Sequence, residues 1–477
     1  MLNAVFRRKT AVMRDQTPSP AEPVLHPSWR ALNAFTYLGP GFEPGAGGNA
    51  VVGGPPGSSR SDGPSLATPQ LLAGYRLIVK DNIEVAGMPC SSGTPSLRGY
   101  VPKRDAPAVN LLRIAGAEIV GKANMHELAY GITSNNAAFG PVRNLFDLQC
   151  FAGGSSGGTA AAIAAGVVHA GLGTDTGGSS RIPAALNGVV GFRPTVGRYP
   201  MAGVARISPT RDVIGPMGRG VRDVALLDAV LSGNPALRLD AIDIRGLRIG
   251  LPAQHFQESL HTDVSRALGH VIAVLREAGV VFVEADLLDI AAMNAAVSFP
   301  IVLHETKPAL QSYLRQAGLD LTLTQLHEAI ASADVKDIIG QVLNDTIPEE
   351  DYRRALRLGR PRLQELYRSY FATHAAEAVL FPTTPLPACP IEGGDQTVLL
   401  NGERVPTFAT FIRNTDPSSN AGIPAISLPA GFSLRDGLDS KHLPLGIELD
   451  GPAGSDRRLL AIAAAIETVL NRHPYHP

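Results

Sequence analysis

Apolar and polar positions form two alternating patterns along the chain from residue 75 onwards. Short apolar runs, typical of buried strands, are separated by longer segments that are typical of helices. Two strand–helix–strand units stand out, and their segments are Tyr75–Val79, Ala106–Ala115, Glu118–Val120, Leu247–Leu251, Thr262–Ala278 and Val280–Val283. This alternation predicts an α/β protein with a large mixed, mostly parallel β-sheet core that is covered by helices on both faces.

Helical patterns dominate between about residues 290 and 375. The expected helices there are Ala291–Leu314, interrupted at Pro300 and Pro308, followed by Thr324–Ala331 and Glu349–Thr373. Strand-like runs return at Val379–Pro382 and Ala425–Pro429, and the alanine- and leucine-rich Asp456–Leu470 is the last expected helix. A helical block between sheet segments is either a cover over a substrate pocket or a plain structural layer.

Residues 1–70 show the least regular pattern. Gly39–Pro64 is so rich in glycine and proline that a regular helix is excluded, and a mobile loop is expected there. The segment Ser28–Phe35 is interpreted as the end of a helix. The predicted organisation is an N-terminal segment, residues 1–70, followed by a single domain over residues 71–477.

Composition restricts the partners that the protein is expected to have. Of its 477 residues, 42 are basic and 43 acidic, which leaves a net charge of −1. This balance gives no reason to expect nucleic acid or an anionic membrane as a partner. Three widely separated cysteines match no metal-ligand spacing, and no apolar run reaches the roughly 18 residues of a transmembrane helix. We therefore expect a cytoplasmic protein without a metal or an organic cofactor.

Two serine-bearing glycine clusters lie in the middle of the chain. Gly153–Gly158 reads GGSSGG, Asp175–Ser180 reads DTGGSS, and the mostly alanine segment Thr159–Gly166 between them favours a helix. Glycines beside a serine let the backbone take positive φ and approach a ligand closely. Successive N–H groups of such a loop can converge on a developing oxyanion. The clusters therefore indicate either a linker or a nucleophilic serine beside its own oxyanion hole.

Three other interpretations of these clusters meet objections in the surrounding sequence. A flexible linker is disfavoured because an apolar run, Val167–Leu172, follows the intervening helix. Gly153–Gly157 matches the G-x-S-x-G nucleophile elbow, but that motif needs a preceding strand, and Asn144–Ala152 is a poor one. Asp175–Gly177 resembles an aspartic-protease triplet, but the chain lacks the second triplet that this chemistry requires.

A nucleophilic serine needs a base, and the best candidate is Lys80. None of the 12 histidines lies in a recognisable acid–base setting, and His126 is better suited to packing or to lining a pocket. Lys80 follows the apolar run Leu77–Val79, which is typical of a buried strand that delivers an amine at its end. Burial lowers a lysine pKa from about 10.4 towards neutrality, as a general base requires. A structural pair between Lys80 and Asp81 remains the alternative.

The three motifs together resemble the amidase signature family. Lys80-Asp81-Asn82, the GGSSGG cluster and the DTGGS cluster occur in the family's order and spacing, which is far more specific than any motif alone. The resemblance runs from about Leu72 to Val230, with weaker similarity near residues 381–385 and 443–447. It implies the amidase signature fold, with the catalytic core at residues 72–230 and a helical cover at about 290–375.

The resemblance also implies a Ser-cis-Ser-Lys triad. Ser179 is then the nucleophile, Ser155 the bridging serine that follows a cis peptide bond, and Lys80 the base. Ser180 stands where the family usually has isoleucine or valine, which is a mild departure that leaves the triad intact. The implied reaction forms an acyl-enzyme on Ser179, and water then hydrolyses it.

Further site residues are implied around this triad. The backbone N–H groups of Thr176, Gly177 and Gly178, with that of Ser179, are expected to form the oxyanion hole. Asp175 and Arg181 are expected to brace the same loop.

The substrate is suggested by two further stretches. Met125–Asn136 and Arg206–Asp212 resemble pocket segments of the indoleacetamide and mandelamide hydrolases within the family. This similarity implies a small primary carboxamide with an aryl or apolar acyl group, cleaved to carboxylate and ammonia. The residues expected to bind substrate are Ala129, Tyr130, Gly131 and Ser156.

Two other functions remain as alternatives. One is the glutaminase subunit of a tRNA-dependent amidotransferase, and the other is a binding subunit that hydrolyses nothing. The sequence does not identify the natural amide, the preference for primary over secondary amides, or the oligomeric state, for which a homodimer is one outcome.

Overall fold

The computed structural model describes residues 26–40, 42, 70–234, 239–434 and 442–475. Most of the loop expected at residues 39–64, and any helix before residue 25, lie outside the described residues. Where the end of a helix was expected, a 3₁₀-helix, Pro27–Leu32, leads into strand β1, Phe35–Leu38.

Eleven of the described strands form one sheet, in the order β1-β3-β2-β6-β8-β7-β14-β15-β11-β9-β10. The strands after β1 are β2 (Arg76–Lys80), β3 (Glu118–Ala123), β6 (Ala170–Asp175), β7 (Val190–Arg193), β8 (Val213–Gly218), β9 (Arg248–Gly250), β10 (Val281–Val283), β11 (Ala378–Pro382), β14 (Ala425–Phe432) and β15 (Pro444–Asp450). Two small hairpins pair β4 (Asn135–Asn136) with β5 (Gly140–Pro141) and β12 (Thr397–Leu400) with β13 (Glu403–Pro406). The predicted α/β protein with a large mixed sheet is confirmed.

Parallel pairing is confined to the two flanks of this sheet. Strand β2 pairs in parallel with β3 and β6, and β9 pairs in parallel with β10 and β11. The strands between them, from β6 through β8, β7, β14 and β15 to β11, all pair antiparallel, as does β1 with β3. The parallel share of the whole sheet is therefore smaller than the sequence pattern indicated.

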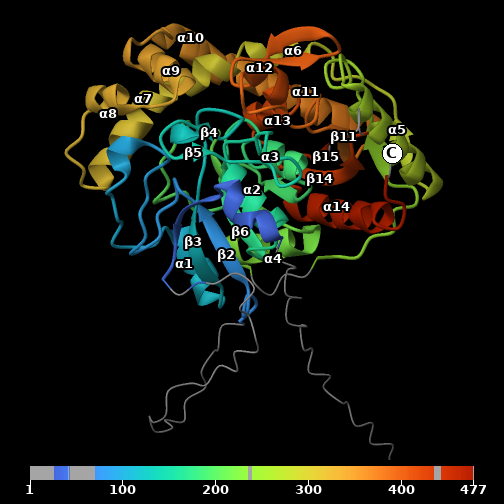
Figure 1. Ribbon diagram of the computed structural model, residues 1–477. Helices are drawn as coiled ribbons and strands as arrows, with labels where there is room; N and C mark the ends of the chain where they lie inside the picture. Colours follow the sequence, from blue (N-terminus) through green and yellow to red (C-terminus); the bar gives the residue numbers. More distant parts are fainter. Residues whose placement is uncertain (1–25, 41, 43–69, 235–238, 435–441, 476–477) are drawn as a thin grey trace, which may run out of the picture.

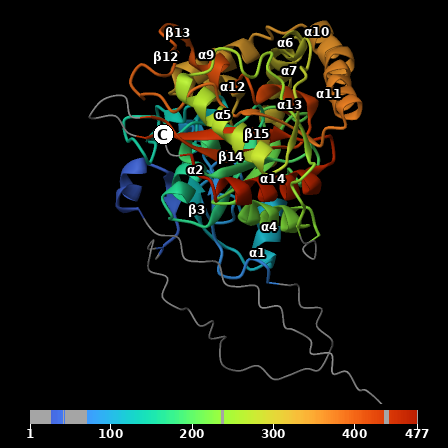
Figure 2. The same ribbon diagram turned by 90° about the vertical axis from the view of Figure 1, so that its right-hand side faces the viewer.

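One face of the sheet is covered by the helices α1 (Pro107–Ile114), α4 (Val221–Leu231), α5 (Thr262–Glu277) and α14 (Asp456–Leu470). Figure 2 shows α1, α4 and α14 stacked below the strands. Leu77 and Val79 of β2 point into this layer, where they join a large apolar cluster with the buried faces of these helices. Because side chains alternate along a strand, Ile78 and Lys80 point to the opposite face.

The opposite face carries helices built from small residues. They are α2 (Gly157–Ala164), α3 (Arg181–Asn187) and α13 (Asp416–Ala421). Ile78 packs there among the buried alanines of α2, whose small side chains let this helix lie close to the sheet. The two serine-bearing glycine clusters lie at the N-terminal ends of α2 and α3, so both are brought to the face that Lys80 also reaches.

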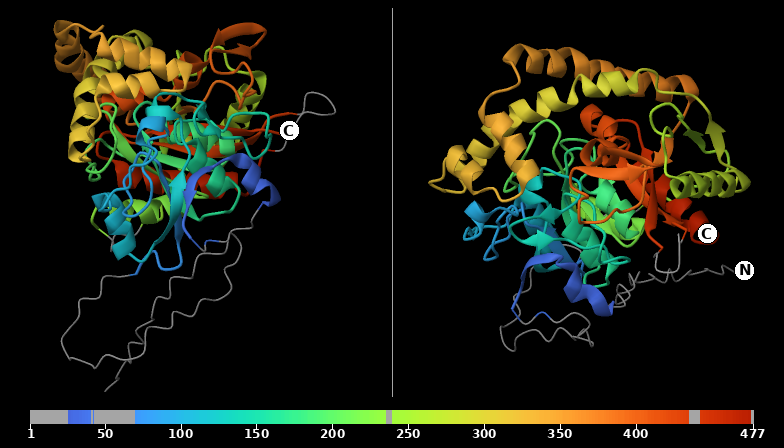
Figure 3. Two further views of the ribbon diagram at one scale, coloured as in Figure 1. Left: turned by 60° about the vertical axis from the view of Figure 1, so that its left-hand side comes forward. Right: turned by 45° about the horizontal axis from the view of Figure 1, so that its top comes forward.

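A group of helices between residues 290 and 374 lies along one edge of the molecule, at the top of Figure 1. They are α6 (Ile290–Ala295), α7 (Ser298–Gln316), α8 (Leu323–Ala329), α9 (Ala333–Leu343), α10 (Glu349–Arg354), a π-helical turn (Ala355–Gly359) and α11 (Arg360–His374). The right-hand view of Figure 3 shows long helices of this group running across the top of the molecule. The predicted interruption at Pro308 is wrong, since α7 continues through it, and α9 was not predicted.

The remaining helical elements are short. They are the 3₁₀-helices Pro95–Leu97 and Glu127–Ala129 and the helix α12 (Thr407–Ile412). Across the described ranges, every helix falls short of the length and apolar character that a bilayer span demands.

The close contact of α2 with the backbone of Asn124 and Ala34 leads to a prediction about stability. A Cβ at Gly158 would lie 2.3 Å from the carbonyl oxygen of Asn124 and 2.5 Å from that of Ala34, and neither backbone group can move away easily. We expect Gly158→Ala to lower the free energy of unfolding by about 1–3 kcal/mol, measured by urea denaturation. The matched control is Gly269→Ala in α5, where a Cβ meets nothing within 4 Å. It is expected to raise stability by about 0.5–1 kcal/mol, and equal effects of the two substitutions would contradict the close packing.

Candidate active site

Lys80 lies at the end of β2 and is fully buried. Its Nζ donates to the hydroxyl of Ser155 at 2.7 Å and to that of Thr174 at 2.9 Å. Burial lowers the pKa of Lys80 to about 7, although the negative charges of Asp175 and Asp212 act in the opposite direction. An amine with this pKa is about half neutral at pH 7 and mostly neutral above it, and the neutral form can accept a proton from a hydroxyl.

Asp81 does not pair with Lys80. Its carboxylate accepts a hydrogen bond from Nζ of Lys122 at 3.3 Å and a short one from the hydroxyl of Ser91. Lys122 is as deeply buried as Lys80, so this ion pair satisfies both of its members inside the protein. The ion pair with Asp81 that was the alternative for Lys80 is therefore formed by Lys122. This second lysine lies on β3, and the sequence analysis did not single it out.

Ser155 and Ser156 occupy the turn that leads into α2, and they face different partners. The Gly154–Ser155 peptide bond is cis, and the Ser155 hydroxyl contacts Lys80. The Ser156 hydroxyl is buried and bonds the backbone of Thr174, donating to its carbonyl at 3.2 Å and accepting from its N–H at 3.3 Å. Ser156 is thus held against β6 and is absent from the described lining of the cavity, unlike the other residues expected to bind substrate.

Ser179 lies on the turn between β6 and α3 and is half-buried. It lines a cavity of about 500 Å³, a size typical of sites for small molecules. The carbonyl of Ser179 accepts a hydrogen bond from the N–H of Ser156 at 3.1 Å, which joins the two glycine clusters. Among the described residues, its hydroxyl makes no hydrogen bond, so the link between Ser155 and Ser179 hydroxyls that a relay needs is not formed in this structure.

The amides of this turn differ in what they bind. Thr176 and Gly177 line the cavity. The N–H of Gly178 donates to the Asp175 carboxylate at 3.0 Å, so it is already engaged by the protein, in contrast to its expected place in the oxyanion hole. Within the described part of the chain, the N–H groups of Thr176, Gly177 and Ser179 donate to no acceptor. These three amides are therefore the donors that remain for an anion in the cavity.

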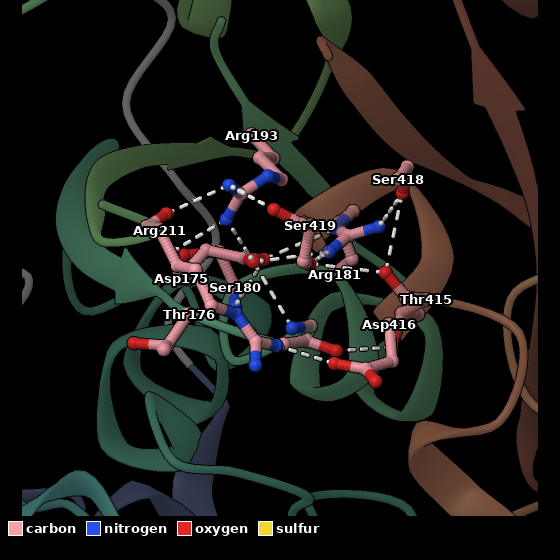
Figure 4. Close-up of polar contacts among 12 residues, drawn as sticks. Asp175, Thr176, Ser180, Arg181, Arg193, Arg211, Thr415, Asp416, Ser418 and Ser419 are labelled. Atoms are coloured by element: carbon pink, nitrogen blue, oxygen red, sulfur yellow. Dashed lines mark hydrogen bonds and ion pairs between the residues drawn. The ribbon is translucent and has the colours of Figure 1, made fainter. Parts of the chain in front are cut away.

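Asp175 is the centre of a buried network that holds the turn (Figure 4). Its carboxylate accepts hydrogen bonds from Nη2 and Nε of Arg181, at 3.0 and 3.1 Å, and from Nη1 of Arg193 at 3.0 Å. It also accepts from the N–H of Ser180 at 3.2 Å. Burial alone raises the pKa of the Asp175 carboxyl, but the two guanidinium groups outweigh it and hold that pKa well below its usual range.

Arg181 extends this network to distant parts of the chain. Its guanidinium forms a short ion pair with Glu448 of β15 and donates to the hydroxyls of Ser418 at 2.9 Å and Ser419 at 2.6 Å, both on α13. Arg193 donates to the carbonyls of Arg211 at 2.7 Å and Ser419 at 3.2 Å. The turn that carries Ser179 is therefore fixed to β7, β15 and α13 through two buried arginines.

The remaining residues expected to contact substrate line the cavity. Ala129, Tyr130 and Gly131 all belong to its wall. The ring of His126 packs directly against Gly131, with Nδ1 accepting from the N–H of Ser134 at 3.2 Å and Nε2 lying 3.0 Å from Asp334. Both ring nitrogens are thus engaged away from Ser155 and Ser179, which agrees with a packing role for His126.

Much of the cavity wall comes from residues that sequence reasoning missed. The apolar side chains among them are contributed mainly by α6, α7, α9 and α12, and they include Phe299, Val302, Ile338, Phe408 and Ile412. Phe299 and Phe408 are 47% and 38% exposed, and their ring centroids lie 6.4 Å apart. The described residues hold no group of three or more His, Cys, Asp or Glu side chains arranged for a metal ion.

The arginine network gives a prediction for Asp175→Asn. This change leaves two buried guanidinium groups without their shared charge partner, so we expect the free energy of unfolding to fall by about 3–5 kcal/mol. Thermal unfolding measures the effect. The control is Glu377→Gln, which removes a partly exposed pair with Arg458 and is expected to leave the unfolding midpoint unchanged. A wild-type midpoint for Asp175→Asn would contradict the role given to the network.

Comparisons with known proteins place the chain in one family. A family model described as Amidase matches residues 61–460. The chain is 46% identical over 401 residues to an indoleacetamide hydrolase from Agrobacterium vitis, covering 84% of each chain. It is 41% identical over 423 residues to a mandelamide hydrolase from Pseudomonas putida, covering 85% of this chain and 80% of that one.

Solved structures give the same result. The structure superimposes on a peptide amidase from Stenotrophomonas maltophilia with a TM-score of 0.70 at 29% identity, covering 83% of this chain and 82% of that one. The family model spans most of this chain, and the relatives match it over most of their own length. The chain therefore belongs to the amidase family and is an amide hydrolase.

Proposed function

We propose that the protein hydrolyses a small primary carboxamide with an aryl or apolar acyl group to a carboxylate and ammonia. The observation that carries this proposal is the 2.7 Å hydrogen bond between a buried lysine, Lys80, and Ser155, beside a cavity that Ser179 lines. A lysine with a pKa of about 7 is suited to accept a proton in this position. No cofactor is required for this chemistry.

The proposed reaction begins with proton transfer along the triad. Neutral Lys80 takes a proton from Ser155, Ser155 takes one from Ser179, and the Ser179 oxygen attacks the amide carbonyl. The first link is present in the structure, and the second forms when the Ser179 hydroxyl, which has no other partner among the described residues, turns from the cavity towards Ser155.

The tetrahedral intermediate is proposed to place its oxyanion against the turn between β6 and α3. The free N–H groups of Thr176, Gly177 and Ser179 are the proposed donors, and all three residues line the cavity. Each such donor contributes roughly 10²- to 10³-fold in rate. The proton then returns through Ser155 to the leaving nitrogen, because an amide anion is a very poor leaving group. Water hydrolyses the acyl-enzyme by the same route.

The substrate class is inferred from the cavity wall and from the relatives. Phe299 and Phe408 line the cavity and are partly exposed, so that their rings can pack against an aryl acyl group. Two of the relatives are named indoleacetamide hydrolase and mandelamide hydrolase, and both names denote amides that carry an aromatic ring. We further propose that residues 71–477 form one amidase domain, in which the helices at about 290–375 serve as a cover, because α6, α7 and α9 supply part of the cavity wall.

A panel of amides tests the proposed substrate. The purified protein alone, without a partner, ATP or tRNA, is expected to release ammonia from phenylacetamide at least 10-fold faster than from acetamide or glutamine, judged by kcat/KM. Ser179→Ala is the control and should release none while keeping its thermal unfolding midpoint. Preference for glutamine would favour an amidotransferase subunit, and failure to release ammonia from any amide would contradict hydrolysis.

The proposed base predicts a specific pH dependence. Because only neutral Lys80 accepts a proton, kcat/KM should rise with pH through a single midpoint near 7 and stay level above it. Lys80→Arg should lose roughly 10²- to 10⁴-fold activity at every pH, since a guanidinium stays charged. Lys122→Arg is the matched control, because Lys122 is equally buried but pairs with Asp81. Substantial activity in Lys80→Arg would contradict the neutral-lysine mechanism.

A further inference from the structure

Asp212 is a buried carboxylate beside the active-site turn. It is 3% exposed, and it lies at the end of a loop that enters β8. One carboxylate oxygen accepts a hydrogen bond from the Thr176 hydroxyl at 2.6 Å. The other accepts from the N–H groups of Ile207 and Ser208, each at 2.9 Å. The carboxylate therefore joins the turn between β6 and α3 to a second loop on the far side of it.

This second loop is itself held by the helical group. Glu305 of α7 accepts hydrogen bonds from the Ser208 hydroxyl at 2.6 Å and from the N–H of Thr210 at 3.1 Å. The loop thus has little freedom to follow Thr176 if the turn moves. A carboxylate fixed by two backbone N–H groups on a clamped loop is a rigid acceptor for the Thr176 hydroxyl.

We propose that Asp212 is a positioning residue of the hydrolysis: its carboxylate fixes the turn that carries Thr176 and Ser179, and its negative charge acts on Lys80. The inference rests on the proposed function, because it assigns Asp212 a part in the reaction of that same site. Asp212 touches no substrate in this proposal, since only Thr176 of the pair reaches the cavity wall.

The negative charge of Asp212 is compensated less well by nearby cations than the negative charge of Asp175. Two carboxylates face Lys80, Asp175 at the end of β6 and Asp212 on the loop before β8, and both favour the charged amine. Asp175 is in direct contact with Arg181 and Arg193. Asp212 instead has Arg206 as an ion-pair partner, with the Arg206 Nε 3.7 Å from the carboxylate and the Arg206 side chain 28% exposed. Removing the Asp212 charge is therefore expected to favour neutral Lys80.

The test measures how fast a serine-directed fluorophosphonate labels Ser179 as a function of pH. This readout does not depend on which amide is the substrate. For Asp212→Asn we expect two changes: a plateau rate at least about 10-fold lower, because the turn is no longer fixed, and a midpoint roughly half a pH unit or more below that of the wild type. The midpoint moves to lower pH because loss of the negative charge lowers the pKa of Lys80. A purely structural role for Asp212 predicts no shift of the midpoint.

Two further variants separate position from charge. Thr176→Val removes the hydroxyl but keeps the shape and every charge, so it should lower the plateau and leave the midpoint unchanged. The matched control is Asp456→Asn, a buried carboxylate that likewise accepts from a threonine hydroxyl, that of Thr195 at 2.6 Å, and from a backbone N–H at 2.8 Å. It should change neither the plateau nor the midpoint.

The outcomes distinguish this inference from the proposed function. Wild-type protein that is labelled at Ser179, together with Asp212→Asn that keeps the wild-type midpoint, would overturn the inference and leave the proposed function in place. Labelling of Thr176→Val at the wild-type rate would overturn it as well, and this variant decides the matter if Asp212→Asn does not fold. Wild-type protein that is not labelled at Ser179 would instead contradict the proposed triad itself.

Discussion

The burial of Lys80 between two hydroxyl groups is the interaction on which the proposed chemistry depends. Its amine meets Ser155 and Thr174, and among the described residues it forms no ion pair. Lys122 shows the alternative, because it is equally buried but has Asp81 as a partner. An unpaired buried ammonium is costly, and the cost is reduced when the amine loses its proton. Lys80 is thereby suited to act as the proposed base without histidine.

The rest of the structure keeps two turns in contact with this amine. One turn begins α2 and carries Ser155, and the other begins α3 and carries Ser179. The N–H of Ser156 donates to the carbonyl of Ser179, and Asp175 is bound by two buried arginines that reach β7, β15 and α13. Because these arginines have no freedom to move, the free amides of the second turn are held in place before substrate arrives, as electrostatic stabilisation of an oxyanion requires.

Sequence reasoning could predict the elements and site residues that local pattern and motif spacing encode. The apolar run before Lys80 predicts a buried strand end, and the mostly alanine segment after Ser155 predicts a helix. It could not reach contacts between segments far apart in the chain, such as the bond from Thr176 to Asp212 or the meeting of Phe299 with Phe408. The place expected for Gly178 in the oxyanion hole differs for another reason. Its N–H donates to the Asp175 side chain, and a glycine-rich sequence does not specify in which direction each N–H points.

The central claim, that Lys80 loses its proton near pH 7, is tested most directly by titrating the lysine itself. Protein labelled with ¹³C at the lysine ε-carbons gives one NMR signal per lysine, and the signal missing from Lys80→Arg belongs to Lys80. The account predicts that this signal titrates with a midpoint near 7. A midpoint near the ordinary lysine pKa of about 10.4 would contradict it, because Lys80 would then be a cation throughout the pH range of catalysis.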